Sequence, residues 1–150
     1  MKSVLYAMAV RKIRIILDTN WYVSATINKK SRRTLYELIT NKNVVIIFSS
    51  ELMNEYNHVI KRDKFKKVIK PQQANRFINL VLPNLENIEI KADLSGSRDL
   101  SDNFLLSLSL DGKADYLVTG DMDLLILKSS GSTKIITLID FLAIISPQTQ

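Results

Sequence analysis

The chain has 150 residues, of which 46% are apolar and 24% charged, and its formal net charge is +6. This length and apolar content favour a single globular domain with its own core. The absence of cysteine excludes disulfide bonds, cysteine-ligated zinc and a thiol nucleophile. No run approaches the roughly 20 apolar residues that span a bilayer, so we expect a cytoplasmic protein with no membrane segment.

Strand and helix patterns alternate along the chain. Short, β-branched apolar runs predict strands at 13–17, 44–48, 87–90, 116–119 and 134–138. Helices are expected to begin near Ser31, after Ser49 or Ser50, at Pro71 and after Ser101, with two more at 124–128 and 139–145. In the fourth helix we expect Phe104, Leu105, Leu108 and Leu110 to face inward. This alternation predicts a three-layer α/β/α sandwich around a five-stranded parallel sheet.

The domain boundaries follow from the same pattern. We expect residues 1–12 to form a weakly ordered leader, residues 13–146 to form one domain, and residues 147–150 to form a tail. The sequence has no internal repeat and no interdomain linker.

Positive charge is concentrated in the first half of the chain. Residues 1–80 contain sixteen Lys and Arg and five acids, whereas residues 81–150 contain five Lys and Arg and ten acids. Basic clusters at 29–33 and 61–67 would attract a polyanionic substrate. The candidate substrate-binding residues are Lys29, Lys30, Arg32, Arg33, Lys61 and Arg62. The alternative interpretation is that these side chains are ordinary solvated surface.

Acidic residues occur where a parallel α/β sheet would gather its ligand-binding groups. Asp18 follows the first predicted strand, and Asp121 and Asp123 follow the fourth. In such sheets the ligand crevice lies beyond the carboxyl ends of the strands. Glu55 and Asp102 lie near the starts of two helices and complete the candidate set. Because clustered carboxylates repel one another, they favour a bound Mg²⁺ or Mn²⁺, both of which prefer oxygen ligands.

Each acid also has a structural explanation. Asp18 could cap the turn that follows it, and Asp121 or Asp123 could cap the next helix. Asp102 could simply stabilise a helix start, with Asp99 as a competing candidate. Glu55 could be a surface residue, and Glu51 is its main rival.

Four ordered motifs resemble the PIN-domain ribonucleases. They are Ile16-Leu17-Asp18-Thr19-Asn20, Leu52-Met53-Asn54-Glu55-Tyr56, the segment 98–104 around Asp102, and the segment 114–125 that contains Thr119-Gly120-Asp121-Met122-Asp123. The resemblance covers about residues 13–145 and is greatest to the branch of toxins in toxin–antitoxin pairs. It implies that Asp18, Glu55, Asp102 and Asp121 bind the metal, with Asp123 as an accessory acid and Asn20 and Thr119 in supporting positions. The long basic stretch between Glu55 and Pro71 departs from the family pattern.

The sequence limits which chemistry this site can perform. With His58 as the single histidine, neither paired-imidazole cleavage nor an independent Ser/His/Asp triad is available, and we expect His58 to be exposed. No Gly-rich phosphate loop is present. Metal-assisted hydrolysis remains, and together with the PIN-domain resemblance it implies hydrolysis of RNA phosphodiesters with one or two Mg²⁺ or Mn²⁺ ions.

Single-stranded RNA fits a narrow acidic site with basic flanks. Trp21 and Tyr22 could stack on its bases, or could pack in the core or at a subunit contact. The toxin resemblance implies a small antitoxin, and exposed apolar helix faces suggest a homodimer. The alternatives are a non-catalytic RNA- or protein-binding module of the same fold and a Mg²⁺-binding receiver-type signalling domain.

Overall fold

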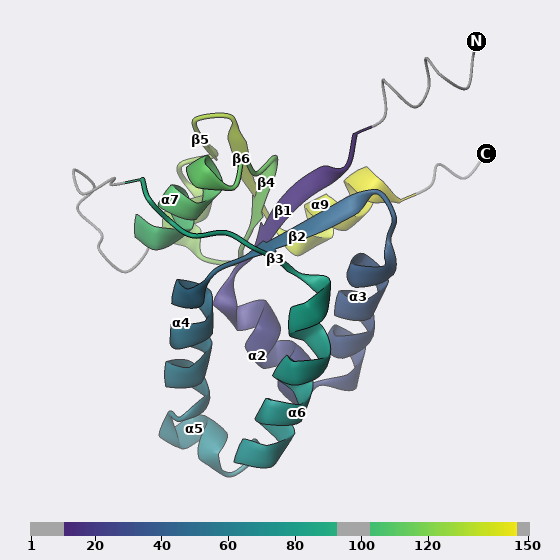
Figure 1. Cartoon of the computed structure of the whole chain (residues 1–150), viewed down its shortest axis with the longest axis vertical. Coiled ribbons are helices and arrows are strands. Elements are labelled where there is room, and N and C mark those ends of the chain that lie inside the picture. Colours follow the sequence, from purple (N-terminus) through teal and green to yellow (C-terminus); the bar gives the residue numbers. More distant parts are fainter. Residues whose placement is uncertain (1–10, 93–102, 147–150) are drawn as a thin grey trace.

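The computed structural model describes residues 11–92 and 103–146. Figure 1 shows a central sheet with helices packed around it. The strand order is β3-β2-β1-β4-β6-β5. The strands are β1 (Ile13–Leu17), β2 (Val44–Phe48), β3 (Glu86–Asn87), β4 (Tyr116–Val118), β5 (Ser129–Ser130) and β6 (Thr133–Ile136). The first five in spatial order, β3 to β6, pair in parallel, so the predicted five-stranded parallel sheet is confirmed. β5 adds a short antiparallel strand at one edge that the sequence did not predict.

The helices surround this sheet and extend beyond it. They are α2 (Thr19–Ile27), α3 (Lys29–Thr40), α4 (Ser50–Ile60), α5 (Asp63–Lys66), α6 (Pro71–Val81), η1 (Leu82–Asn84), α7 (Asn103–Asp111), α8 (Met122–Leu125) and α9 (Leu138–Ile145). In Figure 1, α4, α5 and α6 form an arm that leads away from the carboxyl ends of β1 and β2. In the part of the chain that the structure describes, no helix is both long and apolar enough to cross a membrane.

Local signals explain most helix boundaries. The hydroxyl of Ser49 accepts a hydrogen bond from Leu52 N and starts α4, and Pro71 occupies the first turn of α6, both as predicted. α3 begins two residues earlier than predicted because the side chain of Asn28 caps it through Lys30 N and Ser31 N. The predicted cap of α7 at Ser101 lies outside the described residues.

Four predictions about the elements are wrong. The helix predicted at 124–128 is α8 at Met122–Leu125, because the side chain of Asp121 caps an earlier start through Asp123 N. No helix was predicted at 19–27, because the apolar residues of α2 are not confined to one face and include β-branched and aromatic types. The third strand occupies Glu86–Asn87 instead of 87–90; Ile88 N still donates to Phe48 O at 2.8 Å, but the chain beyond it is irregular. Leu110 is 58% exposed, because the inward face of α7 carries Leu105 and Leu108.

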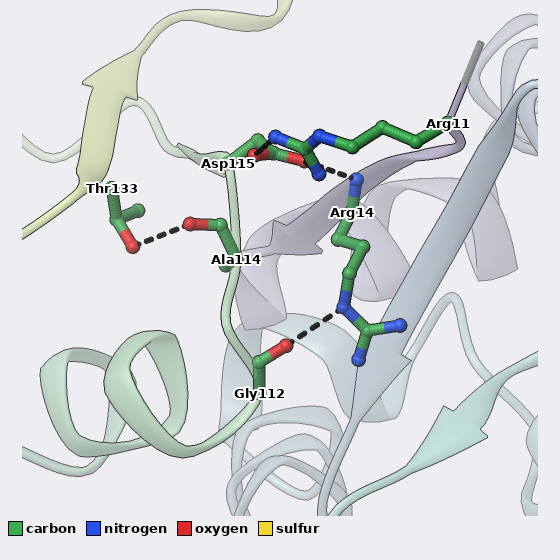
Figure 2. Close-up of polar contacts among 6 residues, drawn as sticks. All are labelled: Arg11, Arg14, Gly112, Ala114, Asp115 and Thr133. Carbon is green, nitrogen blue, oxygen red and sulfur yellow. Dashed lines mark hydrogen bonds and ion pairs between the residues drawn. The ribbon is translucent and has the colours of Figure 1, made fainter. Parts of the chain in front are cut away.

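A polar cluster at the amino ends of the strands fixes the register of β1, β4 and β6 (Figure 2). The carboxylate of Asp115 accepts hydrogen bonds from Arg14 N at 2.9 Å and from both terminal nitrogens of Arg11 at 3.1 and 2.6 Å. Arg14 Nε donates to Gly112 O at 2.8 Å, and the hydroxyl of Thr133 donates to the neighbouring Ala114 O at 2.7 Å. Arg14 also forms an ion pair with Glu86 across the sheet. We call Arg11, Arg14 and Asp115 the register clamp.

Partial burial raises the pKa of Asp115, but the hydrogen bonds from Arg11 and Arg14 outweigh it and hold that pKa below its ordinary value. A lowered native pKa means that the carboxylate stabilises the fold above the ordinary carboxyl range. This contribution is lost as the pH falls through the native value.

We expect Asp115→Asn to lower the free energy of unfolding at pH 7 by about 1 kcal/mol, because it weakens charge-assisted hydrogen bonds. The deficit should shrink as the pH falls, which urea unfolding at a series of pH values would measure. Glu37→Gln, at an exposed position within α3 and away from its first turn, is the matched control. An equal deficit at all pH values would contradict the role of the Asp115 charge.

Candidate active site

Asp18 is held at the carboxyl end of β1 by both its backbone and its side chain. Its N–H donates to Val118 O at 3.0 Å and so continues the pairing of β1 with β4. Although Asp18 occupies the position before α2, its side chain does not cap that helix. Instead, Asp18 Oδ2 accepts a 2.6 Å hydrogen bond from the hydroxyl of Thr119, and only 8% of the residue is exposed. The capping explanation for Asp18 is therefore wrong.

Thr119 joins Asp18 to Asp121. While its hydroxyl donates to Asp18, the same oxygen accepts a hydrogen bond from Asp121 N at 3.0 Å. Asp121 Oδ1 in turn accepts from Asp123 N at 2.9 Å and caps α8, as expected for one of these two acids. Thr119 is fully buried and Asp121 is half-buried. The chain Asp18–Thr119–Asp121, here called the acid bridge, spans the carboxyl ends of two adjacent parallel strands.

The electrostatics of the acid bridge are unfavourable in the protein alone. Burial raises the pKa of Asp18, and so does the nearby charge of Asp121. The hydrogen bond from Thr119 opposes this shift, as do the nearby backbone N–H groups of Thr19 and Asn20, which do not reach capping geometry, but together they do not cancel it. In residues 11–92 and 103–146, ion pairs join Arg11 to Asp115, Arg14 to Glu86 and Lys66 to Asp63, and none involves Asp18 or Asp121.

The other predicted ligands are placed less closely. Glu55 is half-buried on α4, while Asp123 and Asn20 are exposed on α8 and α2. Within the described residues, no three acids or histidines come together as a group that could hold a metal ion. Asp102 and its rival Asp99 lie outside the described residues. The structure thus brings together Asp18, Thr119 and Asp121, while the metal-binding roles of these and of the other predicted acids stay predictions.

A buried hydrogen bond that the sequence analysis missed positions α4 beside α2. The hydroxyls of Thr26 and Tyr56 lie 2.6 Å apart, and the ring of Tyr56 stacks on Phe77 of α6 with centroids 6.4 Å apart. Tyr56 directly follows Glu55, so this contact fixes the part of α4 that carries the glutamate. The sequence offers no signal for it, because two hydroxyl-bearing residues 30 positions apart show no pattern.

The basic candidates divide into exposed residues and one anchored residue. Lys29, Lys30, Arg33, Lys61 and Arg62 are exposed. Arg32 is half-buried, and its guanidinium donates to Ala25 O at 2.9 Å and Thr26 O at 3.0 Å, at the end of α2. Arg32 therefore has a structural role, whatever it contributes to substrate binding.

For three further side chains, the structure agrees with one of the interpretations offered from the sequence. His58 is exposed on α4, as predicted. Tyr22 is buried with its ring edge-on to Phe48, at a centroid distance of 5.3 Å, so it belongs to the core and is not available to stack on a base. Trp21 is half-buried and packs against the same core.

Comparison with known proteins now decides the family. A family model described as the PIN domain matches residues 14–123. The chain belongs to the PIN-domain family. An uncharacterized protein of Methanocaldococcus jannaschii is 25% identical over 122 residues, which are 78% of this chain and 76% of that one. A crystal structure of VapBC2 from Rickettsia felis bound to a DNA fragment from their promoter is similar in fold, with a TM-score of 0.55 and 21% identity over 82% of this chain and 97% of that chain.

PIN domains are generally nucleases that use divalent metal ions, and the acid bridge of this PIN domain fits such an ion. Mg²⁺ is commonly bound through one or two carboxylates, with water and substrate phosphates as its remaining ligands. Asp18 and Asp121 would supply those carboxylates. The adjacent Thr19 hydroxyl is buried and has no hydrogen-bond partner among the residues described, which leaves a further oxygen donor beside Asp18.

Metal binding at the acid bridge should appear in the thermal unfolding of this PIN domain. Mn²⁺ or Mg²⁺ should raise the Tm of the wild type, because a ligand of the folded state at 100 times its Kd adds about 2.7 kcal/mol of stability. The Asp18→Asn variant should lose this rise, and in EDTA it should melt above the wild type because a buried charge is gone. Each kcal/mol corresponds to about 2–4 °C for a domain of this size.

The pH dependence of the Tm tests whether the charge of Asp18 destabilises the folded chain. Since the pKa of Asp18 is raised in the folded chain, its charge costs stability only once the pH exceeds the ordinary carboxyl range. The advantage of Asp18→Asn in EDTA should therefore shrink in acid. Equal metal-induced shifts in the wild type and the variant would place the ion elsewhere.

Arg32 provides a separate test of its anchoring role. Arg32→Ala should lower the free energy of unfolding by about 1–3 kcal/mol, because Ala25 O loses its side-chain donor and Thr26 O keeps only the donor Gln73 Nε2. Arg33→Ala, at the exposed neighbouring position, should change it by less than about 0.5 kcal/mol. Equal effects of the two substitutions on urea unfolding would contradict the structural role of Arg32.

Proposed function

We propose that this PIN domain is a Mg²⁺- or Mn²⁺-dependent endoribonuclease that hydrolyses phosphodiester bonds of single-stranded RNA. The observation that carries the proposal is the acid bridge: a buried carboxylate and a second acid, oriented by one threonine, without a basic partner among the described residues. Burial and the charge of Asp121 both raise the pKa of Asp18, and a bound divalent cation would stabilise the charged carboxylate against both effects.

Each acid has a proposed part in hydrolysis. Asp18 and Asp121 hold the main ion, Asp102 completes its shell, and Glu55 orients the attacking water or helps to hold a second ion, with Asp123 as an accessory. Thr119 keeps the two main carboxylates at a fixed spacing, and Asn20 supports them from the first turn of α2. The bound ion supplies a water of lowered pKa and neutralises charge on the phosphoryl oxygens.

The substrate assignment rests on charge. Lys29, Lys30 and Arg33 on α3, and Lys61 and Arg62 at the end of α4, are exposed cations suited to RNA phosphates. Because Arg32 is anchored to α2, we expect it to contribute less than its neighbours. Single strands can follow such separated contacts more easily than a stiff duplex can.

We further propose that the chain is the toxin of a toxin–antitoxin pair. The motif resemblance and the similarity in fold to Rickettsia felis VapBC2 support this assignment. Met122, Ile126 and Ile139 are 74%, 77% and 80% exposed on α8, the residue after it and α9, and they offer an apolar surface for an antitoxin or a second copy of the chain. The second candidate is a non-catalytic RNA- or protein-binding module, favoured by the absence of a three-acid group among the described residues.

Cleavage of a labelled single-stranded RNA would separate these two functions. The wild type should cut with Mn²⁺ or Mg²⁺ and not with EDTA. Thr119→Val should lower the rate by about 10–100-fold, as expected for loss of a group that orients ligands. Asp18→Asn should lower it further, and Glu55→Gln should also impair cutting.

Matched controls exclude general damage to the fold. Asp140→Asn and Glu37→Gln remove exposed carboxylates on α9 and α3 and should cut like the wild type. If the folded wild type binds RNA but cuts it with neither metal, the non-catalytic module is the correct function.

A further inference from the structure

The end of the helical arm carries a dense positive charge. Residues 61–70, here called the basic tip, include α5 and connect α4 to α6. Asp63 is their one acid, and their cations are Lys61, Arg62, Lys64, Lys66, Lys67 and Lys70. All seven of these charged residues are exposed. In Figure 1 the basic tip, which includes α5, lies at the end of α4 farthest from the strands.

Little of this charge is neutralised within the protein. Asp63 forms a 3.5 Å ion pair with Lys66, and both side chains stay largely exposed, at 99% and 67%. Surface pairs of this kind contribute little, so the pair does not hold Lys66 away from another anion. Lys64 lies over the ring of Phe65, 4.9 Å from its centroid. No other ion pair of the basic tip occurs in the described part of the chain.

A hollow of about 650 Å³ opens beside the basic tip, between α4 and α6. Its wall combines three kinds of group. Lys61 and Lys66 provide positive charge, Ile60 and Ile69 provide apolar surface, and Asn57 and Asn75 provide side-chain amides. Among the residues that the structure describes, no acidic side chain lines the hollow. Cations, apolar surface and amides together match the phosphate, the face and the edge of one nucleotide.

The hollow shares no residue with the acid bridge, but it lies along α4, which also carries the proposed ligand Glu55. Lys61 follows Glu55 by six residues on α4, which is about 9 Å along the helix axis. At 3.6 residues per turn, Asn57 and Lys61 lie on the flank of α4 away from Glu55. A strand bound at the acids must therefore pass around the end of α4 to enter the hollow.

We propose that the hollow at the basic tip binds a nucleotide of the RNA strand a few nucleotides from the cleaved bond. Lys61 and Lys66 would contact its phosphates, Ile60 and Ile69 its base, and Asn57 and Asn75 the base edge. This proposal rests on the proposed nuclease function. It makes the enzyme selective for strands long enough to occupy both places, with a base preference outside the cleaved step.

Binding without cleavage tests the hollow directly. In EDTA, the Asp18→Asn protein should bind a fluorescein-labelled 20-nucleotide single-stranded RNA, measured by anisotropy at several salt concentrations. Adding Lys61→Gln and Lys66→Gln should weaken binding and lower the slope of log K against log salt by about 1.4, or about 0.7 per lost phosphate contact in a single strand. Adding Lys12→Gln and Lys42→Gln, which remove the same charge at the amino ends of β1 and β2, should leave the slope unchanged.

A second variant distinguishes specific binding of a nucleotide in the hollow from non-specific electrostatic attraction of RNA to the basic tip. Asn57→Ala with Asn75→Ala should weaken binding several-fold without changing the salt slope, because amides contact base edges and not phosphates. Equal losses in the Lys61/Lys66 and Lys12/Lys42 variants, or no loss in the asparagine variant, would overturn the proposal.

Cleavage by otherwise wild-type protein gives an independent readout. The Lys61/Lys66 variant should lose more kcat/KM on a 20-nucleotide RNA than on a 5-nucleotide RNA, so the advantage of the long strand should fall. If no protein cuts RNA but the binding results hold, the hollow stands and the nuclease function fails. If cutting is normal and the basic tip has no effect on binding or on length dependence, the nuclease function stands and the hollow proposal is wrong.

Discussion

The pairing of β1 with β4 is the constraint on which the rest of the site depends. At the amino end of these strands, Asp115 N donates to Arg14 O while the Asp115 carboxylate accepts from Arg14 N, so one residue holds both main-chain groups of its partner. Because side chains alternate between the two faces of a sheet, a slip of one residue would send Asp18 to the opposite side from Thr119. The observed register aligns Leu17 with Val118 and so makes Asp18 and Thr119 neighbours.

The two ends of the sheet treat charge in opposite ways. At the amino end, carboxylates are matched by arginines, and the network stabilises the folded chain. At the carboxyl end, a buried carboxylate faces a second acid and raises the energy of the folded chain. Such uncompensated charge is retained where a ligand is to be bound, since the ligand then relieves the repulsion. The ion pairs at the amino ends of the strands thereby offset the destabilisation caused by the buried acid at the carboxyl ends.

Much of this arrangement could be predicted from the sequence, and the failures have physical causes. Short apolar runs predicted four of the five parallel strands within two residues at either end, and the positions of Asp18 and Asp121 after two of them predicted that these acids would meet. α2 was missed because tertiary burial on most of its faces erased the helical period. Thr26 with Tyr56, and Arg11 with Asp115, pair residues far apart in sequence, and no local pattern encodes such contacts. The spacing of Glu55 from the other acids depends on how α4 packs, which composition alone does not determine.

The capping hydrogen bond of Asp121 affects how tightly a ligand is bound. One carboxylate oxygen is already committed to Asp123 N, so the side chain is confined to one rotamer before any ligand arrives. Ordering a free side chain on binding costs about 0.5–1.5 kcal/mol. Here that entropy is lost during folding, when the first turn of α8 forms. The short helix α8 thus pre-organises the Asp121 side chain. Local fraying of the first turn of α8 would weaken ligand binding without unfolding the domain.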